Sequence, residues 1–289
     1  MQKKISLVLS GGGARGIAHI GVIQVLKEQG YQIQSIAGTS MGALVGGLYA
    51  SGGLEKFTDW LVNADVKEAL KMLDFSLKLP GLIKAEKIMR QIDNFLTIKE
   101  IEELPIKYTA IATDIQSLSE IVFDSGSLSK AIRASIAIPS VFTPVFDEGK
   151  ILIDGGLVNN LPINRLAKDE TFPVVAVCVN AEVPMSKKYS EIMHQNKSKE
   201  HLAKLQKIKN HLAKYINRID HKNKNHIGYA ELIDKSIHLM IGRASQQIIQ
   251  QNPPEKIINI PREICGTFDF LKAEKIIEIG RQACIDVLK

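Results

Sequence analysis

The sequence predicts an α/β protein with three layers, α/β/α, in which a mainly parallel central sheet lies between helices. Short, β-branched apolar runs alternate with longer segments of helical periodicity, the pattern of strands joined by crossover helices. Apolar residues make up 45% and charged residues 24% of the chain, which is typical of a globular protein. The length of 289 residues allows one or two domains. Because the α/β pattern returns after its one irregular insertion, we predict a single domain over residues 1–289.

The order of the predicted elements supports this fold class. Strands are predicted at residues 4–10, 33–38, 108–114, 150–156, 172–180 and 256–261, and residues 120–126 pair beside the third of them. Helices are predicted at residues 16–30, 41–53, 127–140, 162–170, 227–251 and 272–289. Gly30 ends the first helix, and Pro139 stops the helix that begins at residue 127. The chain then divides into a motif-bearing part over 5–170, a basic helical insertion or lid over 183–226, and a C-terminal part over 227–289.

Several classes of protein are disfavoured by composition. The apolar run near the N-terminus stops at glycines after about six residues, short of a signal-peptide core. The uncharged segment 29–54 holds six glycines from Gly38 to Gly53 and suits no lipid-facing helix. We therefore predict neither a signal peptide nor a transmembrane helix, and a cytoplasmic location. The cysteines lie far apart and lack CxxC spacing, so neither a disulfide framework nor a zinc site is predicted; they are Cys178, Cys265 and Cys284.

A glycine-rich turn, GGGARG at residues 11–16, follows the first predicted strand and opens the first helix. Gly11, Gly13 and Gly16 match the dinucleotide fingerprint G-x-G-x-x-G. The acidic residue that holds the ribose is missing from the end of the second strand, and no P-loop lysine follows the glycines. Exposed amides at a helix N-terminus still stabilise developing negative charge, so the loop is a candidate oxyanion hole.

The stretch GTSMG at residues 38–42 matches G-x-S-x-G between a predicted strand and a predicted helix. In a nucleophile elbow the serine occupies a strained turn, and the flanking glycines prevent collisions where the chain doubles back. Gly38 and Gly42 fill those positions around Ser40. The alternative is a serine in an ordinary glycine turn, but the strand-to-helix context favours the nucleophile.

A nucleophilic serine needs a base, and an aspartate is the better-placed candidate. Six of the seven histidines lie in or beside a basic segment, and His19 falls inside the first helix. Asp154 ends the predicted strand ILID, and in a parallel sheet it would lie at the same carboxyl edge as Ser40. Its alternative role is to cap the turn before Gly155 and Gly156. Together, three strand ends would bring donors, nucleophile and base to one crevice.

In this order, GGGARG, GTSMG and DGG resemble the motifs of the bacterial branch of the patatin-like phospholipase family. The block IRASIAIPSVFTPV at residues 132–145 is similar to the one that this branch carries between its nucleophile and its aspartate. The resemblance covers about residues 5–170, and weaker similarity continues in INIP and FDFLKAEKIIEIG near the C-terminus. It implies the patatin-like fold, of the FabD/lysophospholipase type.

The resemblance implies a dyad without histidine, in which Ser40 is the nucleophile and Asp154 takes its proton directly or through water. It implies an oxyanion hole formed by three backbone positions, Gly11, Gly12 and Gly13. Arg15 matches the basic position of the family's loop. The implied reaction is hydrolysis of an acyl ester in a phospholipid, lysophospholipid or related lipid through an acyl-serine intermediate. No metal and no cofactor are implied.

The net charge of +6 is concentrated in one segment, which runs from Lys187 to Lys224. It holds eleven basic and three acidic residues, against 26 basic and 28 acidic in the rest of the chain. Apolar residues recur at helical spacing in it, at Leu202, Leu205, Ile208, Leu212, Tyr215, Ile216 and Ile219. Such a helix could lie on an anionic membrane surface, or its stripe could pack on the core or a second subunit. Tyr215 is the one aromatic residue in 201–219, so no nucleic-acid partner is predicted.

Two other functions stay open on the sequence alone. An acyltransferase or a general carboxylesterase would use the same acyl-serine. A lipid-binding or regulatory protein could keep the fold without catalysis, although the intact motifs argue against it.

Overall fold

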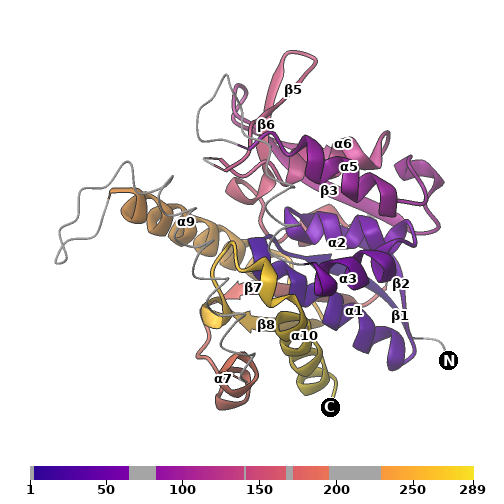
Figure 1. Cartoon of the computed structure of the whole chain (residues 1–289), viewed down its shortest axis with the longest axis vertical. Coiled ribbons are helices and arrows are strands. Elements are labelled where there is room, and N and C mark those ends of the chain that lie inside the picture. Colours follow the sequence, from indigo (N-terminus) through magenta and orange to yellow (C-terminus); the bar gives the residue numbers. More distant parts are fainter. Residues whose placement is uncertain (1–2, 65–82, 140, 167–171, 195–228) are drawn as a thin grey trace.

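The computed structural model describes residues 3–64, 83–139, 141–166, 172–194 and 229–289. They form an eight-stranded sheet with helices around it (Figure 1). Neighbouring strands follow the order β5-β6-β3-β2-β1-β7-β8, and β4 also pairs with β3. From β3 to β8 along this path every pairing is parallel, whereas β4, β5 and β6 join antiparallel. The predicted α/β/α class with a mainly parallel sheet is confirmed.

The strands are β1 Lys3–Leu9, β2 Tyr31–Thr39, β3 Lys107–Asp114, β4 Ser119–Phe123, β5 Val145–Asp147, β6 Lys150–Asp154, β7 Val174–Ala181 and β8 Lys256–Pro261. The helices are α1 Ala18–Glu28, α2 Met41–Ala50, α3 Leu54–Asn63, α5 Glu86–Phe95, α6 Leu128–Ser135, α7 Lys187–His194, α9 Tyr229–Gln251 and α10 Ala273–Leu288. α6 ends earlier than predicted, because the residue before Pro139 is disfavoured in a helical conformation, and the Ala137 and Ile138 amides already donate to Ala134 and Ile136 instead of four residues back. The helix predicted at 162–170 is a 3-10 turn, Ile163–Arg165, in its described part.

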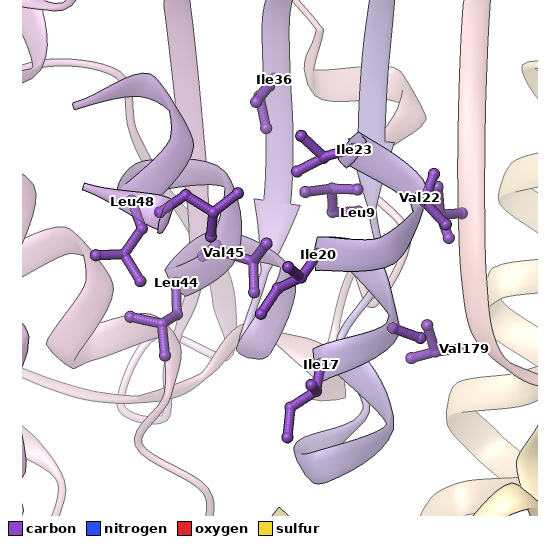
Figure 2. Close-up of a cluster of buried hydrophobic side chains, with 14 of the residues drawn as sticks. Leu9, Ile17, Ile20, Val22, Ile23, Ile36, Leu44, Val45, Leu48 and Val179 are labelled. Carbon is purple, nitrogen blue, oxygen red and sulfur yellow. The ribbon is translucent and has the colours of Figure 1, made fainter. Parts of the chain in front are cut away.

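Apolar cores lie on both faces of the sheet. The larger core packs Leu7 and Leu9 of β1 against α1, α2 and α10. Figure 2 shows part of it, where side chains of α1 and α2 cover β1 and β2. The second core contains Val8 and Cys178, with Ile248 of α9 packed against them. Because successive strand side chains point to opposite faces, β1 is buried on both sides, as its continuous apolar run predicts.

The direction of β6 differs from the prediction. We expected Asp154 to end a parallel strand, but Ala112 pairs with Asp154 in an antiparallel ladder. The reason is a hairpin: β5 and β6 are joined through Glu148 and Gly149, which both have positive φ, as a tight two-residue turn requires. A hairpin returns the chain antiparallel, whereas a crossover helix would have produced a parallel strand.

Asp154 nevertheless lies near Ser40, at the carboxyl ends of β2 and β3, as predicted. β4 pairs with residues 110–114 of β3, so β2 and β6 must share the other edge of β3. On that edge Thr39, the last residue of β2, lies opposite Ile111. Asp154, the last residue of β6, lies opposite the next residue of β3, Ala112. Two strands running in opposite directions therefore meet end to end, and this junction is where the candidate site forms.

The predicted basic insertion or lid over 183–226 lies mostly outside the described residues, which include only its start and α7. The division of the chain into parts stays a prediction. Among the described helices, none has the length and apolar character needed to cross a membrane. The described part of the chain also contains no cluster of histidine, cysteine and acidic residues suited to a metal ion. The three cysteines are buried and form no disulfide.

Candidate active site

Ser40 occupies a sharp turn between β2 and α2. Its backbone has φ 54° and ψ −122°, a conformation that non-glycine residues rarely adopt, and α2 begins at the next residue. A Cβ added to Gly38 would lie 2.6 Å from the backbone of Gly42, and a Cβ on Gly42 would collide with the carbonyl of Leu9. Both glycines are therefore needed for the close passage of the chain, as the nucleophile-elbow pattern predicts.

The side chain of Ser40 faces the carboxyl of Asp154 and lowers the pKa of that group as a hydrogen-bond donor. Ser40 is 5% exposed and Asp154 is 6% exposed, so the contact is largely shielded from water. The main-chain junction of β2 and β6 accounts for their proximity, although 114 positions separate the two residues in the sequence. The structure thus brings together the nucleophile and base that the sequence predicted.

Burial changes the acid–base chemistry of Asp154. Loss of hydration disfavours the ionised carboxylate and raises the pKa of Asp154 to about 6. Hydrogen bonds from Ser40 and from the Gly156 amide, at 2.8 Å, act in the opposite direction. Gly155 has no room for a side chain, because an added Cβ would collide with the carbonyl of Ile111. The DGG turn is therefore packed tightly against β3 while its aspartate reaches Ser40.

The glycine loop lies directly beside Ser40. A Cβ on Gly11 would come within 3.1 Å of the Ser40 Cβ and 2.5 Å of Asn160 Oδ1. The Gly11 amide donates to the Asn160 carbonyl at 3.1 Å, and its own carbonyl accepts from Asn180 Nδ2 at 2.7 Å. Within the described residues, no acceptor pairs with the amides of Gly12 and Gly13. Of the three predicted donors, Gly12 and Gly13 are the ones with open N–H groups.

Arg15 supports the glycine loop through buried hydrogen bonds. Its side chain is only 4% exposed, and its Nε donates to Asn180 Oδ1 at 2.8 Å. Its Nη1 donates to the Cys265 carbonyl at 3.1 Å. Asn180 thereby connects Arg15 to Gly11, so the guanidinium fixes the loop conformation. Gly16 permits the following turn, because a side chain there would collide with Met41.

His19 lies beneath the loop rather than in contact with Ser40. It is fully buried, and its Nε2 lies 2.8 Å from the Ser10 carbonyl, the residue before the glycines. Burial lowers the pKa of His19 to about 4, so the ring is neutral near pH 7 and Nε2 is the donor. The Nδ1 atom has no hydrogen-bond partner among the described residues.

The sequence did not single out Asn160, Asn180 or Ser135, which hold the site in place. Asn160 follows the DGG turn in the run VNNLP, and Asn180 is the last residue but one of β7. Ser135 lies inside the block that resembles a family motif, but nothing in its neighbours marks it as a contact of Ser40. The register of the strands is needed to see these contacts, and a single sequence does not contain it.

Comparison with known proteins places the chain among its relatives. A family model described as patatin-like phospholipase matches residues 7–167, more than half of the chain. The chain belongs to this family. The matched range includes the glycine loop, Ser40 and Asp154.

Two relatives illustrate the similarity. An NTE family protein of Mycobacterium bovis is 45% identical over 177 residues, which cover 61% of this chain and 49% of the relative. Mouse patatin-like phospholipase domain-containing protein 6 is 33% identical over 186 residues, or 62% of this chain and 14% of that protein. The chain thus spans at most about half the length of these relatives. Among solved structures, VipD from Legionella pneumophila superposes with a TM-score of 0.48 and 16% identity, covering 99% of this chain and 67% of VipD.

Proposed function

We propose that this patatin-like protein is a serine lipid acyl hydrolase, of the phospholipase A or lysophospholipase type, that works through a Ser40–Asp154 dyad. The observation that carries the proposal is the buried approach of the Ser40 side chain to the Asp154 carboxyl, whose pKa it lowers as a hydrogen-bond donor. It occurs in a strained elbow and beside the open amides of Gly12 and Gly13. Nucleophile, base and oxyanion donors are the three parts that acyl transfer requires.

The proposed acylation begins when Asp154 removes the hydroxyl proton of Ser40. The Ser40 oxygen bonds to the ester carbonyl carbon, and the electron pair of the C=O bond moves onto oxygen. The amides of Gly12 and Gly13 stabilise this oxyanion. When the intermediate collapses, the bond to the alcohol breaks and Asp154 returns its proton to the departing oxygen. The acyl group remains on Ser40.

Deacylation repeats these steps with water. Asp154 takes a proton from the water that attacks the acyl-serine, and it then protonates Ser40 as the fatty acid leaves. A carboxylate of ordinary pKa is a weak base for a hydroxyl, and the raised pKa of Asp154, about 6, improves the match while leaving it ionised at pH 7. Asp154 therefore fills the role that histidine has in a triad.

The proposed substrates are phospholipids or lysophospholipids, a class supported by the family of the chain. Hydrolysis and transfer share the acyl-serine and differ only in whether water or an alcohol removes the acyl group. Product analysis with and without an alcohol acceptor separates a hydrolase from an acyltransferase. A panel of lipid and simple esters separates a lipase from a general carboxylesterase.

The dyad is tested by replacing each member in the purified full chain. We expect Ser40→Ala to lower hydrolysis of a lysophospholipid by about 10³-fold or more and Asp154→Asn by about 10²-fold or more, with both proteins folded. The matched control is Asp114→Asn. Asp114 is also buried at the end of β3, but its carboxylate accepts from the Gln116 and Ile151 amides, at 3.1 and 3.2 Å.

The control variant should hydrolyse the lipid at the parent rate. Parent-level hydrolysis by Ser40→Ala would refute the mechanism. If a fluorophosphonate probe fails to label Ser40 in the parent chain, the protein is a non-catalytic member of the fold.

We also propose a peripheral membrane contact that brings the site to its substrate. Its sequence basis is the basic segment from Lys187 to Lys224, of which the structure describes only α7. Exposed apolar side chains lie on α9 and on the turn against which α9 packs, namely Leu239, Met240 and Leu157. They support an apolar surface near the DGG turn that could enter the lipid interface.

Co-sedimentation with anionic phosphatidylglycerol-containing liposomes tests this contact. Triple replacement of Lys204, Lys207 and Lys214 by glutamate should lower the bound fraction several-fold at low salt, because the attraction is electrostatic. The matched control replaces Lys3, Lys56 and Lys107 by glutamate, an equal change of charge outside the basic segment. Equal binding of the parent and the first variant would exclude the basic segment as the contact.

A further inference from the structure

We propose that residues 135–137, at the C-terminal end of α6, hold the backbones of the two dyad members in position relative to each other, with the Ser135 hydroxyl as a positioning group for Ser40. The inference rests on the proposed function, because it assigns a role in that reaction. It concerns the backbone of the dyad rather than the side chains that react.

The first observation is how the Ser40 amide is satisfied. Because of its positive φ, Ser40 leaves the line of β2, and its N–H has no partner in the sheet or in α2. The amide donates to Ser135 Oγ at 2.8 Å. The Ser135 hydroxyl in turn donates to the carbonyl of Ile111 at 2.6 Å. Ser135 has no exposed surface, so water does not replace it in the native state.

The hydroxyl has to accept one hydrogen bond and donate another. It connects the elbow to the residue of β3 that lies opposite the end of β2, because Ile111 pairs with Thr39. An alanine at 135 would leave both the Ser40 N–H and the Ile111 carbonyl without their partner, and a threonine would retain the bridge.

The second observation is that the same stretch also holds Asp154. The amide of Asp154 donates to the carbonyl of Ala137 at 3.0 Å, two residues beyond Ser135. Its carbonyl accepts from the Thr113 hydroxyl at 3.0 Å. One short piece of chain therefore contacts the backbone of both dyad members. Because α6 ends at Ser135, residues 135–137 are free to direct these groups at β2 and β6 rather than along a helix.

The hydrogen bonds of Ser135 give it a specific role in the proposed mechanism. The strained backbone at Ser40, with φ 54°, persists only when neighbouring groups fix it. The bridge from Ile111 through Ser135 to the Ser40 amide fixes it at the point where the nucleophile must face Asp154. Without the bridge, the elbow can relax, and the hydroxyl loses its alignment with the carboxylate and the glycine amides.

The test compares Ser135→Ala with a matched control in the full chain. We expect Ser135→Ala to lower kcat for ester hydrolysis by about 10- to 100-fold with KM within about twofold, since alignment and not binding is lost. Ser35→Ala is the control, because Ser35 is buried on β2, the strand that leads to Ser40, and donates to Ser6 Oγ at 2.8 Å. It should leave kcat unchanged. Ser135→Thr should recover most of the parent kcat.

A second measurement does not depend on activity. Amide hydrogen exchange, followed by NMR at Ser40, should speed up by about tenfold or more in Ser135→Ala and stay at the parent rate in Ser35→Ala. Unchanged exchange and unchanged kcat in a folded Ser135→Ala would overturn the proposal. Equal losses of kcat in both variants would also overturn it, since they would reflect stability alone. If the parent hydrolyses no ester and reacts with no fluorophosphonate, the proposed function fails, while the exchange rates still decide whether Ser135 fixes the elbow.

Discussion

At the scale of single residues, the proposed chemistry depends on one carboxyl group whose properties come from its surroundings. Two influences on the pKa of Asp154 compete: burial favours its neutral form, and hydrogen bonds favour its ionised form. Asp114, at the end of the adjacent strand, shows the other outcome. Hydrogen bonds from Ser117 and nearby amides hold the pKa of Asp114 below its ordinary value. Two aspartates near one sheet edge thus differ in basicity, and only the more basic one contacts Ser40.

This difference predicts the pH dependence of the reaction. Asp154 can take a proton only when ionised, and its pKa is raised to about 6. We expect kcat/KM for an uncharged ester to rise about tenfold per pH unit below pH 6 and to level off above it. The measurement is a profile between pH 4 and pH 9, with the parent and Asp114→Asn sharing the same midpoint. A profile that is flat across pH 4–7 would exclude Asp154 as the base.

At the scale of elements, long periodic segments were predictable and short ones were not. The apolar run of β1, the glycine turn and the periodic helix α1 lie where the sequence predicts them. β5 has only three residues and no distinct pattern, so its hairpin with β6 was missed. The direction of β6 was consequently wrong, although Asp154 was placed at the correct edge. Local composition determines an element's type, but strand direction depends on the connection that precedes it.

The same limit applies to the contacts that hold the site. G-x-S-x-G and DGG mark Ser40 and Asp154 because each motif needs glycines for local steric reasons. Ser135 needs no special neighbours, and its role arises only from the end of α6 meeting the junction of β2 and β6. Arg15 was predicted from resemblance as the basic residue of the loop, and its buried contacts with Asn180 and Cys265 became visible only in the structure.

At the scale of the whole molecule, the site depends on parts of the chain beyond the range that matches the family model. That range ends at residue 167. The glycine loop, however, is held by Asn180 at the end of β7 and by the carbonyls of Cys265 and Thr267 after β8. The C-terminal part therefore holds the glycine loop in place and also completes the sheet.

Two buried titratable groups near the site also link its chemistry to the stability of the whole fold. The pKa of His19 is lowered to about 4, so between pH 4 and 6.5 the unfolded chain binds the extra proton and stability falls as pH falls. The pKa of Asp154 is raised to about 6, so between pH 3.8 and 6 the folded chain binds the extra proton and stability falls as pH rises. Each shift corresponds to about 3 kcal/mol, and the two effects oppose each other in the parent.

Single substitutions should separate the contributions of Asp154 and His19 to the pH dependence of the unfolding free energy. Asp154→Asn should gain up to about 3 kcal/mol in unfolding free energy relative to the parent on going from pH 4 to pH 7, because the cost of a buried carboxylate is removed. His19→Gln, whose amide can still donate to the Ser10 carbonyl, should gain a similar amount in the opposite direction, from pH 7 to pH 4.

Other titrating groups are shared by all the proteins and cancel in the differences. Denaturant unfolding at both pH values measures them, and differences that do not change with pH would show that neither group titrates abnormally in the fold. If the opposite slopes are found, the basicity that the proposed mechanism requires of Asp154 is maintained at a cost in stability at neutral pH.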